Sequence, residues 1–338
     1  MKPRDIVLEA IHHRDTPAVP YTLYFEGGVD KQLDDYYGGP EWRERITEYI
    51  VNVAAVNTDI REKIDETHER DGYGGIWRVD RLPWHLEKPP LDSPSFKGYT
   101  FPSPERFYRP DWKEQARQTS AENPDSFILA NLGWGLFERS WNLRGFENLL
   151  MDTVTTPDFF EEVLDNLMNL YLDFVEYTAE LPIDAILFGD DWGHQQGVIL
   201  GPKRWRQFLK PRWARIYEAV HAHGKIVIHH SCGSVADIMP DIIEIGMDVL
   251  ESVQPEAAGM NPYELKKKWG DKIAFWGGLG SQSTIPLGTP DEIRQEIRRL
   301  RSEMSRGGGY ILAPAKPLQP GTPTENAVAI LETITEEI

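Results

Sequence analysis

The feature that most constrains the fold is an alternation, repeated along most of the chain, between short β-rich runs and longer helical patterns. The β-rich runs are largely apolar and end in small or polar residues, which is typical of parallel strands covered on both faces. We expect seven such strands, at residues 19–26, 127–133, 185–191, 225–233, 248–254, 273–280 and 309–315. Residues 50–56 are either an eighth strand or a helix.

The segments between these strands carry helix start and stop signals. Thr156-Pro157-Asp158 and Thr289-Pro290-Asp291 each combine an N-cap residue, a proline in the first turn and an acid. A third helix, within residues 204–223, is expected to end at Gly224. Strand followed by helix, repeated many times, predicts βαβ units and a parallel sheet.

The fold that we predict is an α/β fold of the (β/α)₈ TIM-barrel type with an elaborated N-terminal region. Residues 1–338 would form one barrel domain, with an irregular insertion at about 72–109 that is rich in Pro, Gly and aromatic residues. The alternative is a doubly wound open sheet. It lacks a convincing phosphate-binding signature, because Gly278-Leu279-Gly280-Ser281 has only two glycines in register and opens no helix immediately.

Composition excludes several classes of protein. The chain has 338 residues, 36 Lys and Arg against 54 Asp and Glu, and a formal net charge of −18. That charge repels phosphate backbones, so nucleic acid is not an expected partner. The single cysteine, Cys232, excludes an intramolecular disulfide framework. The start of the chain lacks a signal peptide and no window is long and apolar enough for a membrane span, so we expect a cytoplasmic protein that acts on a small molecule.

Polar residues gather where the expected strands end, and in a parallel barrel the working residues lie at those ends. Candidates for catalysis are Asp190, Asp191 and Lys316. Candidates for binding a substrate are Tyr24, Glu26, Asn131, Trp134, Gln254 and Trp276. Some of these groups would instead cap helices or tie loops together, and for Asp190 and Asp191 that structural interpretation is equally open.

His230-Ser231-Cys232 is the sharpest of these features. Side chains two positions apart on a strand point the same way, so His230 and Cys232 can converge on one ion while His229 points elsewhere. Imidazole and thiolate are ligands that zinc prefers. The competing interpretation is a buried cysteine that acts as a small hydrophobic residue beside a hydrogen-bonded histidine.

Four blocks, which occur in order, give the chain a family resemblance. They contain FGDDWGHQQG, HHSCGS, FWGGLGSQS and APAKPLQPG, and the similarity covers residues 123–336 well and the first third only loosely. On these blocks the chain resembles the uroporphyrinogen decarboxylase superfamily. The resemblance implies a (β/α)₈ barrel with its site at the barrel mouth, and a homodimer, since superfamily members often pair.

The resemblance leaves two enzyme branches. Decarboxylase members bind substrate carboxylates with an N-terminal arginine-rich loop, whereas residues 21–28 here contain no arginine and one acid, Glu26. Corrinoid-dependent methyltransferases hold zinc with a His-x-Cys pair, which His230 and Cys232 match, and a later Cys. The chain has Ala315 and Lys316 in that later region and no Cys, so a carboxylate would complete the set.

The prediction is therefore a zinc-dependent, methyltransferase-like enzyme that moves a methyl group between a small substrate and a corrinoid protein. Glu251 is the expected third metal ligand, with Asp190, Asp191, Glu138 and Glu26 as other candidates for that place. The alternatives are a decarboxylase of porphyrinogen side chains, which is a lyase, and a barrel that has lost its catalytic set and only binds a ligand.

Overall fold

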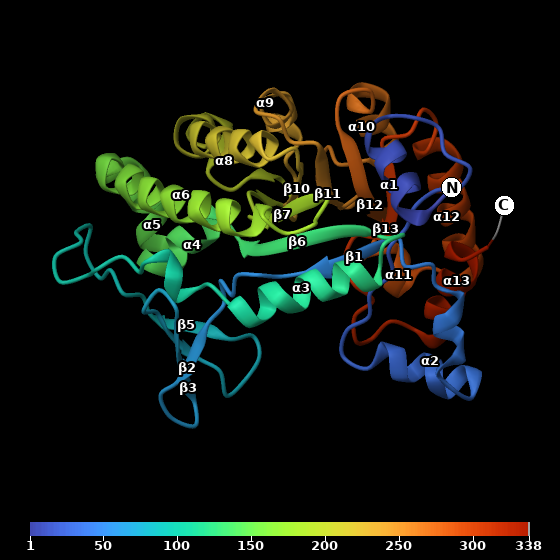
Figure 1. The fold of residues 1–338 in the computed structure, drawn as a ribbon, viewed down its shortest axis with the longest axis horizontal. Coiled ribbons are helices and arrows are strands. Elements are labelled where there is room, and N and C mark those ends of the chain that lie inside the picture. Colours follow the sequence, from blue (N-terminus) through green and yellow to red (C-terminus); the bar gives the residue numbers. More distant parts are fainter. Residues whose placement is uncertain (337–338) are drawn as a thin grey trace.

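The computed structural model describes residues 1–336, and a curled parallel sheet of seven strands forms its centre (Figure 1). The strands follow one another in the order β1-β6-β7-β10-β11-β12-β13, and every neighbouring pair is parallel. Their bounds are β1 Ile50–Val53, β6 Phe127–Trp134, β7 Ala185–Gly189, β10 Ile226–His230, β11 Val249–Val253, β12 Ala274–Leu279 and β13 Tyr310–Pro314.

Helices cover the outer side of this sheet, with α6 and α8 above it, α3 below it and α12 and α13 at one end in the view of Figure 1. Each crossover between parallel strands requires such a covering segment. The helices are α1 Pro3–Ile11, α2 Val29–Tyr37, α3 Pro110–Glu122, α4 Leu136–Arg144, α5 Phe146–Thr155, α6 Pro157–Ala179, α7 Gly201–Arg204, α8 Lys210–Ala222, α9 Met239–Glu244, α10 Pro262–Trp269, α11 Thr284–Leu287, α12 Pro290–Met304 and α13 Thr324–Ile334.

A local signal explains the start of α12. Thr289 accepts a hydrogen bond from the backbone N–H of Glu292, whose carboxylate accepts one from the Thr289 N–H in return, so the capping box is present at α12. The helix expected at 204–223 is broken into α7, a π-helical turn at Trp205–Leu209 and α8. None of the helices within residues 1–336 has the length and apolar character needed to cross a membrane.

The expected strand at residues 19–26 is not a regular strand. It touches the sheet only through two isolated parallel bridges, Tyr21 to Leu312 and Phe25 to Leu318. Residues 50–56, which the sequence left open between helix and strand, contain β1. The α/β class and the parallel, curled sheet are thus confirmed, whereas closure into an eight-stranded barrel stays a prediction.

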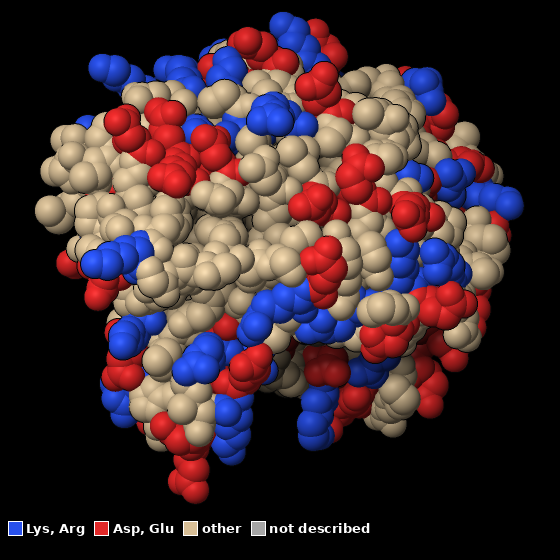
Figure 2. All heavy atoms as spheres, turned by 60° about the vertical axis from the view of Figure 1, so that its left-hand side comes forward, with Lys and Arg blue, Asp and Glu red and all other residues tan. Residues whose placement is uncertain are grey.

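The insertion differs from the expected irregular segment at 72–109. It contains a four-stranded antiparallel sheet that begins at Arg61, earlier than predicted, and projects at the lower left of Figure 1. Its strands are β2 Arg61–Lys63, β3 His68–Asp71, β4 Ile76–Arg78 and β5 His85–Lys88. In Figure 2 basic and acidic side chains are interspersed over this projection and the neighbouring face.

Candidate metal centre

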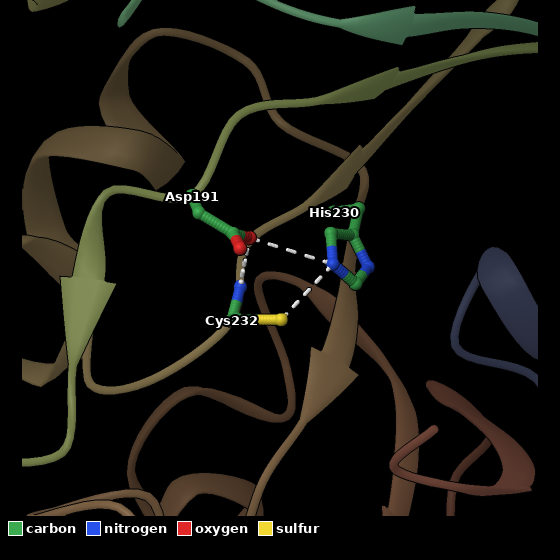
Figure 3. A group of neighbouring side chains, drawn as sticks. All are labelled: Asp191, His230 and Cys232. Carbon is green, nitrogen blue, oxygen red and sulfur yellow. Dashed lines mark hydrogen bonds and ion pairs between the residues drawn. The ribbon is translucent and has the colours of Figure 1, made fainter. Parts of the chain in front are cut away.

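The candidate metal centre lies where the neighbouring strands β7, β10 and β11 end. His230, the last residue of β10, is in register with Gly189 at the end of β7 and with Glu251 in β11. Because these strands are parallel, the loops that follow β7 and β10 leave the sheet at the same edge. This topology brings Asp191, His230 and Cys232 together (Figure 3).

The ligand atoms of these three residues all lie within 4.8 Å of one another. His230 Nε2 is 3.3 Å from Cys232 Sγ and 3.5 Å from Asp191 Oδ1. The backbone N–H of Cys232 donates a 2.7 Å hydrogen bond to Asp191 Oδ1, which ties the two loops together. Asp191 was predicted to be catalytic and was also one of the other candidates for the third metal ligand, and the structure places it in the group of possible ligands.

Two glycines allow the loops to approach so closely. A Cβ atom on Gly193 would lie 2.7 Å from the carbonyl oxygen of Cys232, and a Cβ atom on Gly233 would lie 2.6 Å from the Gly193 carbonyl carbon. Gly233 also has a φ of +73°, which side chains disfavour. The backbone N–H of Ser234 then donates to the His194 carbonyl oxygen. Glycine at both positions therefore helps to place Asp191 beside Cys232.

Glu251, the expected third metal ligand, lies on the other side of the imidazole ring. Its Oε2 is 2.5 Å from His230 Nδ1, whereas Nε2 faces Asp191 and Cys232. A carboxylate in this position fixes the ring orientation and favours a proton on Nδ1, which leaves Nε2 free to bind a metal. Asp191 thus occupies the place that the sequence analysis gave to Glu251.

The electrostatics of the metal-free centre favour a charged imidazole. Burial lowers the pKa of His230, but the charge of Glu251 and the hydrogen bond to Asp191 outweigh it and hold that pKa well above its usual range. Burial raises the pKa of Asp191, and the hydrogen bond and charge of His230 more than offset this and lower it. A bound divalent cation would replace the proton on the imidazole.

The donor set fits zinc. A thiolate, an imidazole and a carboxylate are the side chains that zinc takes in tetrahedral sites, and three protein ligands leave one position open for a substrate. The side chains of His230 and Asp191 are 30% and 38% exposed, so an ion between them would be reachable from solvent. The residues present therefore suit a catalytic rather than a closed structural zinc site.

Asp190, also predicted to be catalytic, has a structural place instead. It is fully buried, and its carboxylate accepts hydrogen bonds from the Phe137 and Glu138 backbone N–H groups at the start of α4 and from the indoles of Trp192 and Trp213. Four donors leave this carboxylate no free oxygen to meet a substrate. Burial raises the pKa of Asp190 to about 6, and these donors oppose the rise.

Two of the predicted substrate-binding residues are buried as well. Gln254 is 2% exposed, and its Oε1 accepts a 2.9 Å hydrogen bond from the Gly233 N–H, so it supports the loop after Cys232. Trp276 is 4% exposed, and its indole donates a 3.0 Å hydrogen bond to Thr22 Oγ1. Both side chains hold the walls of the site together rather than face a ligand.

The remaining predicted residues are accessible to different degrees. Tyr24 and Glu26, on the segment that bridges to β13, are exposed, and so is Asn131 in β6. Trp134, at the end of β6, is half-buried and packs against Trp77 of the projecting sheet, with ring centroids 6.2 Å apart.

Lys316 is half-buried in the chain just after β13. None of these five residues contributes an atom to the Asp191, His230 and Cys232 group.

Sequence reasoning missed the residues that support the centre. Gly193 and Thr22 carry no motif, and their roles depend on contacts between segments far apart in the chain. His229 does turn away from His230, as the strand alternation predicts: it is fully buried, with Nδ1 2.7 Å from the Tyr217 hydroxyl. The alternation of side chains along one strand was enough to predict the orientation of His229. The contacts of Gly193 and Thr22 with distant segments give no pattern in the sequence.

Comparison with known proteins agrees with this fold. The profile of the uroporphyrinogen decarboxylase (URO-D) family matches residues 140–337, so the chain belongs to that family. A methyltransferase from Methanosarcina mazei superposes with a TM-score of 0.72 and 20% identity over 99% of this chain and 98% of that protein. The chain is therefore a member of the uroporphyrinogen decarboxylase superfamily whose fold is shared with a methyltransferase.

Curated relatives match over a shorter span. A uroporphyrinogen decarboxylase from Syntrophotalea carbinolica is 23% identical over 184 residues, which are 53% of this chain and 49% of that protein. One from Thermus thermophilus is 24% identical over 181 residues, 52% of this chain and 48% of the relative. The chain thus spans about half the length of the curated relatives that it matches.

Proposed function

We propose that this protein is a zinc-dependent enzyme that moves a methyl group between a small substrate and a corrinoid carried by a partner protein. The single observation that carries the proposal is the convergence of Asp191, His230 and Cys232 at an accessible edge of the sheet. The fold shared with a methyltransferase supports the same class of activity.

The chain's own residues would divide the work as follows. Asp191, His230 and Cys232 would hold the ion, and Glu251 would keep the His230 ring oriented through Nδ1. When bound, zinc supplies Lewis acidity that lowers the cost of negative charge on a substrate oxygen or sulfur.

Three further residues at this end of the sheet have proposed roles. The ammonium of Lys316 would be a second cation beside the negative charge on the substrate, if its side chain reaches that charge. Exposed Tyr24 and Asn131 would contact the substrate.

Uroporphyrinogen decarboxylation is the second candidate, favoured by the names of the curated relatives. The substrate carries many carboxylates, and a site for it needs cations. The 21–28 segment contains no arginine, and its Glu26 is exposed with Gln319 Nε2 3.4 Å from its carboxylate. An exposed acid in this position repels a polycarboxylate, so we place this activity second.

The test is a pair of assays on zinc-loaded protein. Methylcobalamin is mixed with a panel of small thiols and phenols, and loss of the methyl–cobalt absorbance is followed; uroporphyrinogen is incubated separately, and its decarboxylated products are separated by chromatography. We expect methyl transfer that Cys232→Ser abolishes, and no decarboxylation. Decarboxylation without methyl transfer would overturn the proposal.

A further inference from the structure

The curled sheet has a seam between β1 and residues 21–25. One edge of β1 pairs with β6, and its other edge faces residues 21–25. That segment forms β-bridges with residues 312 and 318 instead of with β1. Among residues 1–336, no backbone hydrogen bond joins the 21–25 segment to β1. Edges that form no ladder are not held at the roughly 4.8 Å spacing of paired strands, so room can remain between them.

Side-chain hydrogen bonds hold the seam in place of a ladder. The Tyr21 hydroxyl accepts a 2.8 Å hydrogen bond from the Thr47 backbone N–H, and the Tyr24 hydroxyl accepts a 3.1 Å hydrogen bond from Asn52 Nδ2. A cavity of about 380 Å³ lies here, lined by residues 21–25 on one side and by residues 42, 43 and 46–50 on the other. We call it the seam cavity. Its volume lies within the usual range for small-molecule sites.

The seam cavity is rich in aromatic rings that are already ordered. Phe25 and Trp42 pack edge to face with centroids 5.3 Å apart, and Tyr21 and Tyr49 do so at 5.2 Å. Tyr24 supplies a fifth ring. Tyr21, Trp42 and Tyr49 are almost fully buried, so Tyr24 and Phe25 present the ring surface that a ligand can reach. Ordered rings lose little entropy when a flat ligand packs on them, so this lining suits a planar apolar group.

Charge narrows the ligand class. Arg43 lines the cavity but is neutralised by Asp34 and by Asp30, which is 3.2 Å away, and its guanidinium stacks on Trp42. Glu48 is exposed at the cavity wall. A negatively charged ligand would thus find an acid and no available cation, and would be repelled.

We propose that the seam cavity binds a planar aromatic group that carries no negative charge. This binding does not depend on the proposed function. The inference also disfavours a polycarboxylate such as a porphyrinogen as the occupant.

Isothermal titration calorimetry with the full chain tests the inference. The probes are 2-naphthol, which is neutral at pH 7, and 2-naphthoate, which has the same ring system and a negative charge. We expect saturable binding of one 2-naphthol per chain and an affinity for 2-naphthoate that is weaker by about tenfold or more. No saturable binding of 2-naphthol, or equal affinity for both probes, would overturn the inference.

Two variants locate the binding. Ile46→Trp fills the cavity, and Thr47→Trp fills it from an exposed position while keeping the backbone N–H that bonds Tyr21, so the second serves if the first does not fold. Each is expected to weaken 2-naphthol binding by about tenfold. The matched control is Val154→Trp, on an exposed site of α5 that is 61% accessible. Unchanged binding in a folded cavity variant would refute the assignment.

Zinc content, measured on the same samples, separates this inference from the proposed function. Binding of 2-naphthol by a protein that retains no zinc would support the subsite and contradict the zinc mechanism. Stoichiometric zinc without 2-naphthol binding would overturn the subsite alone.

Discussion

At the scale of single residues, the two ring nitrogens of His230 contact different side chains. Nε2 faces Cys232 and Asp191, and Nδ1 faces Glu251. A carboxylate behind a metal-bound histidine is expected to raise ligand basicity and fix the ring. The orientation of the His230 ring therefore decides which of its nitrogens faces Cys232 and Asp191.

This arrangement predicts the effect of Glu251→Gln. The amide keeps the size of the side chain but removes its charge, so zinc affinity should fall by about 10- to 100-fold while zinc still binds. Competition with a chelating dye measures the affinity. Glu256→Gln is a matched control farther along the chain, and its effect should be small. Complete loss of zinc in Glu251→Gln would indicate that Glu251 is itself a ligand.

Zinc affinity should also depend on pH. The pKa of His230 is held well above its usual range in the metal-free protein, chiefly by Glu251 once burial is outweighed, so zinc must displace a proton. Because zinc binding releases both the imidazole proton and the thiol proton of Cys232, affinity should rise by more than about tenfold per pH unit between about pH 6 and pH 8. Glu251→Gln should make this dependence less steep. An equally steep dependence in wild type and Glu251→Gln would show that the imidazole is already neutral in the metal-free protein.

Strand geometry predicted which two side chains of the group would lie together, but it did not single out the third from the candidate carboxylates. His230 and Cys232 lie two apart at a strand end, and strand geometry alone brings them together. Asp190 and Asp191 are adjacent in a loop, where no periodicity tells which points inward. The structure decides between them by burial: Asp190 caps α4, and Asp191 bonds the Cys232 N–H.

At the scale of elements, the start of α4 links the metal centre to the helix layer. Asp190 accepts the first N–H groups of this helix, and Glu138 lies in its first turn. Burial raises the pKa of Glu138 to about 8, and the charges of Asp190 and Asp191 add to the rise. The helix therefore carries an acid that holds its proton in the folded, metal-free chain.

This raised pKa predicts the behaviour of Glu138→Gln. The unfolded chain loses the proton near 4.5, while the folded chain keeps it up to about 8, so wild type loses stability as the pH rises through that window. Glutamine has no proton to lose in this range, so the variant should not lose this stability as the pH rises. In chelator-treated protein the variant should be more stable by about 2 kcal/mol near pH 8, after discounting for partial exposure, and unchanged near pH 4.

Urea unfolding at both pH values measures the difference. Glu147→Gln, on α5, is the control, and it should show no such pH dependence. An equal effect of Glu138→Gln at both pH values would contradict the raised pKa.

Element prediction was sound for the covered strands and weaker for the insertion. Strands such as β12 are buried along their whole length, and apolar composition reveals them. β2, β3 and β5 consist mostly of charged or polar residues, of which only Asp71 is buried, so they resemble loops in the sequence. Their pairing depends on antiparallel partners, which a single apolar pattern does not encode.

At the scale of the whole molecule, the 21–25 segment lies between the two ends of the curled sheet, and within residues 1–336 its hydrogen bonds to the β1 side involve its side chains alone. It bridges to residues 312 and 318, and Trp276 donates to Thr22 from within β12. The sequence predicted a regular strand here, because apolar and aromatic residues dominate it. Its seam with β1 was not predictable, since an absent ladder depends on how far the sheet curls.

Thr22→Val tests the importance of this contact for stability. Valine keeps the shape but leaves the buried Trp276 N–H without its acceptor, which should cost about 1–3 kcal/mol of unfolding free energy. The control is Thr333→Val, because the buried Thr333 hydroxyl has no hydrogen-bond partner among the described residues. It should be neutral or stabilising in the same chemical denaturation. Equal effects of the two changes would show that the segment is not held through Trp276.

The central claim is that Asp191, His230 and Cys232 together bind one zinc ion. Elemental analysis of protein dialysed against metal-free buffer tests it most directly, on wild type, Cys232→Ser and Asp191→Asn. We predict about one zinc per chain in wild type and a large loss in both variants. Wild-type protein without zinc, or full zinc in both variants, would contradict the account.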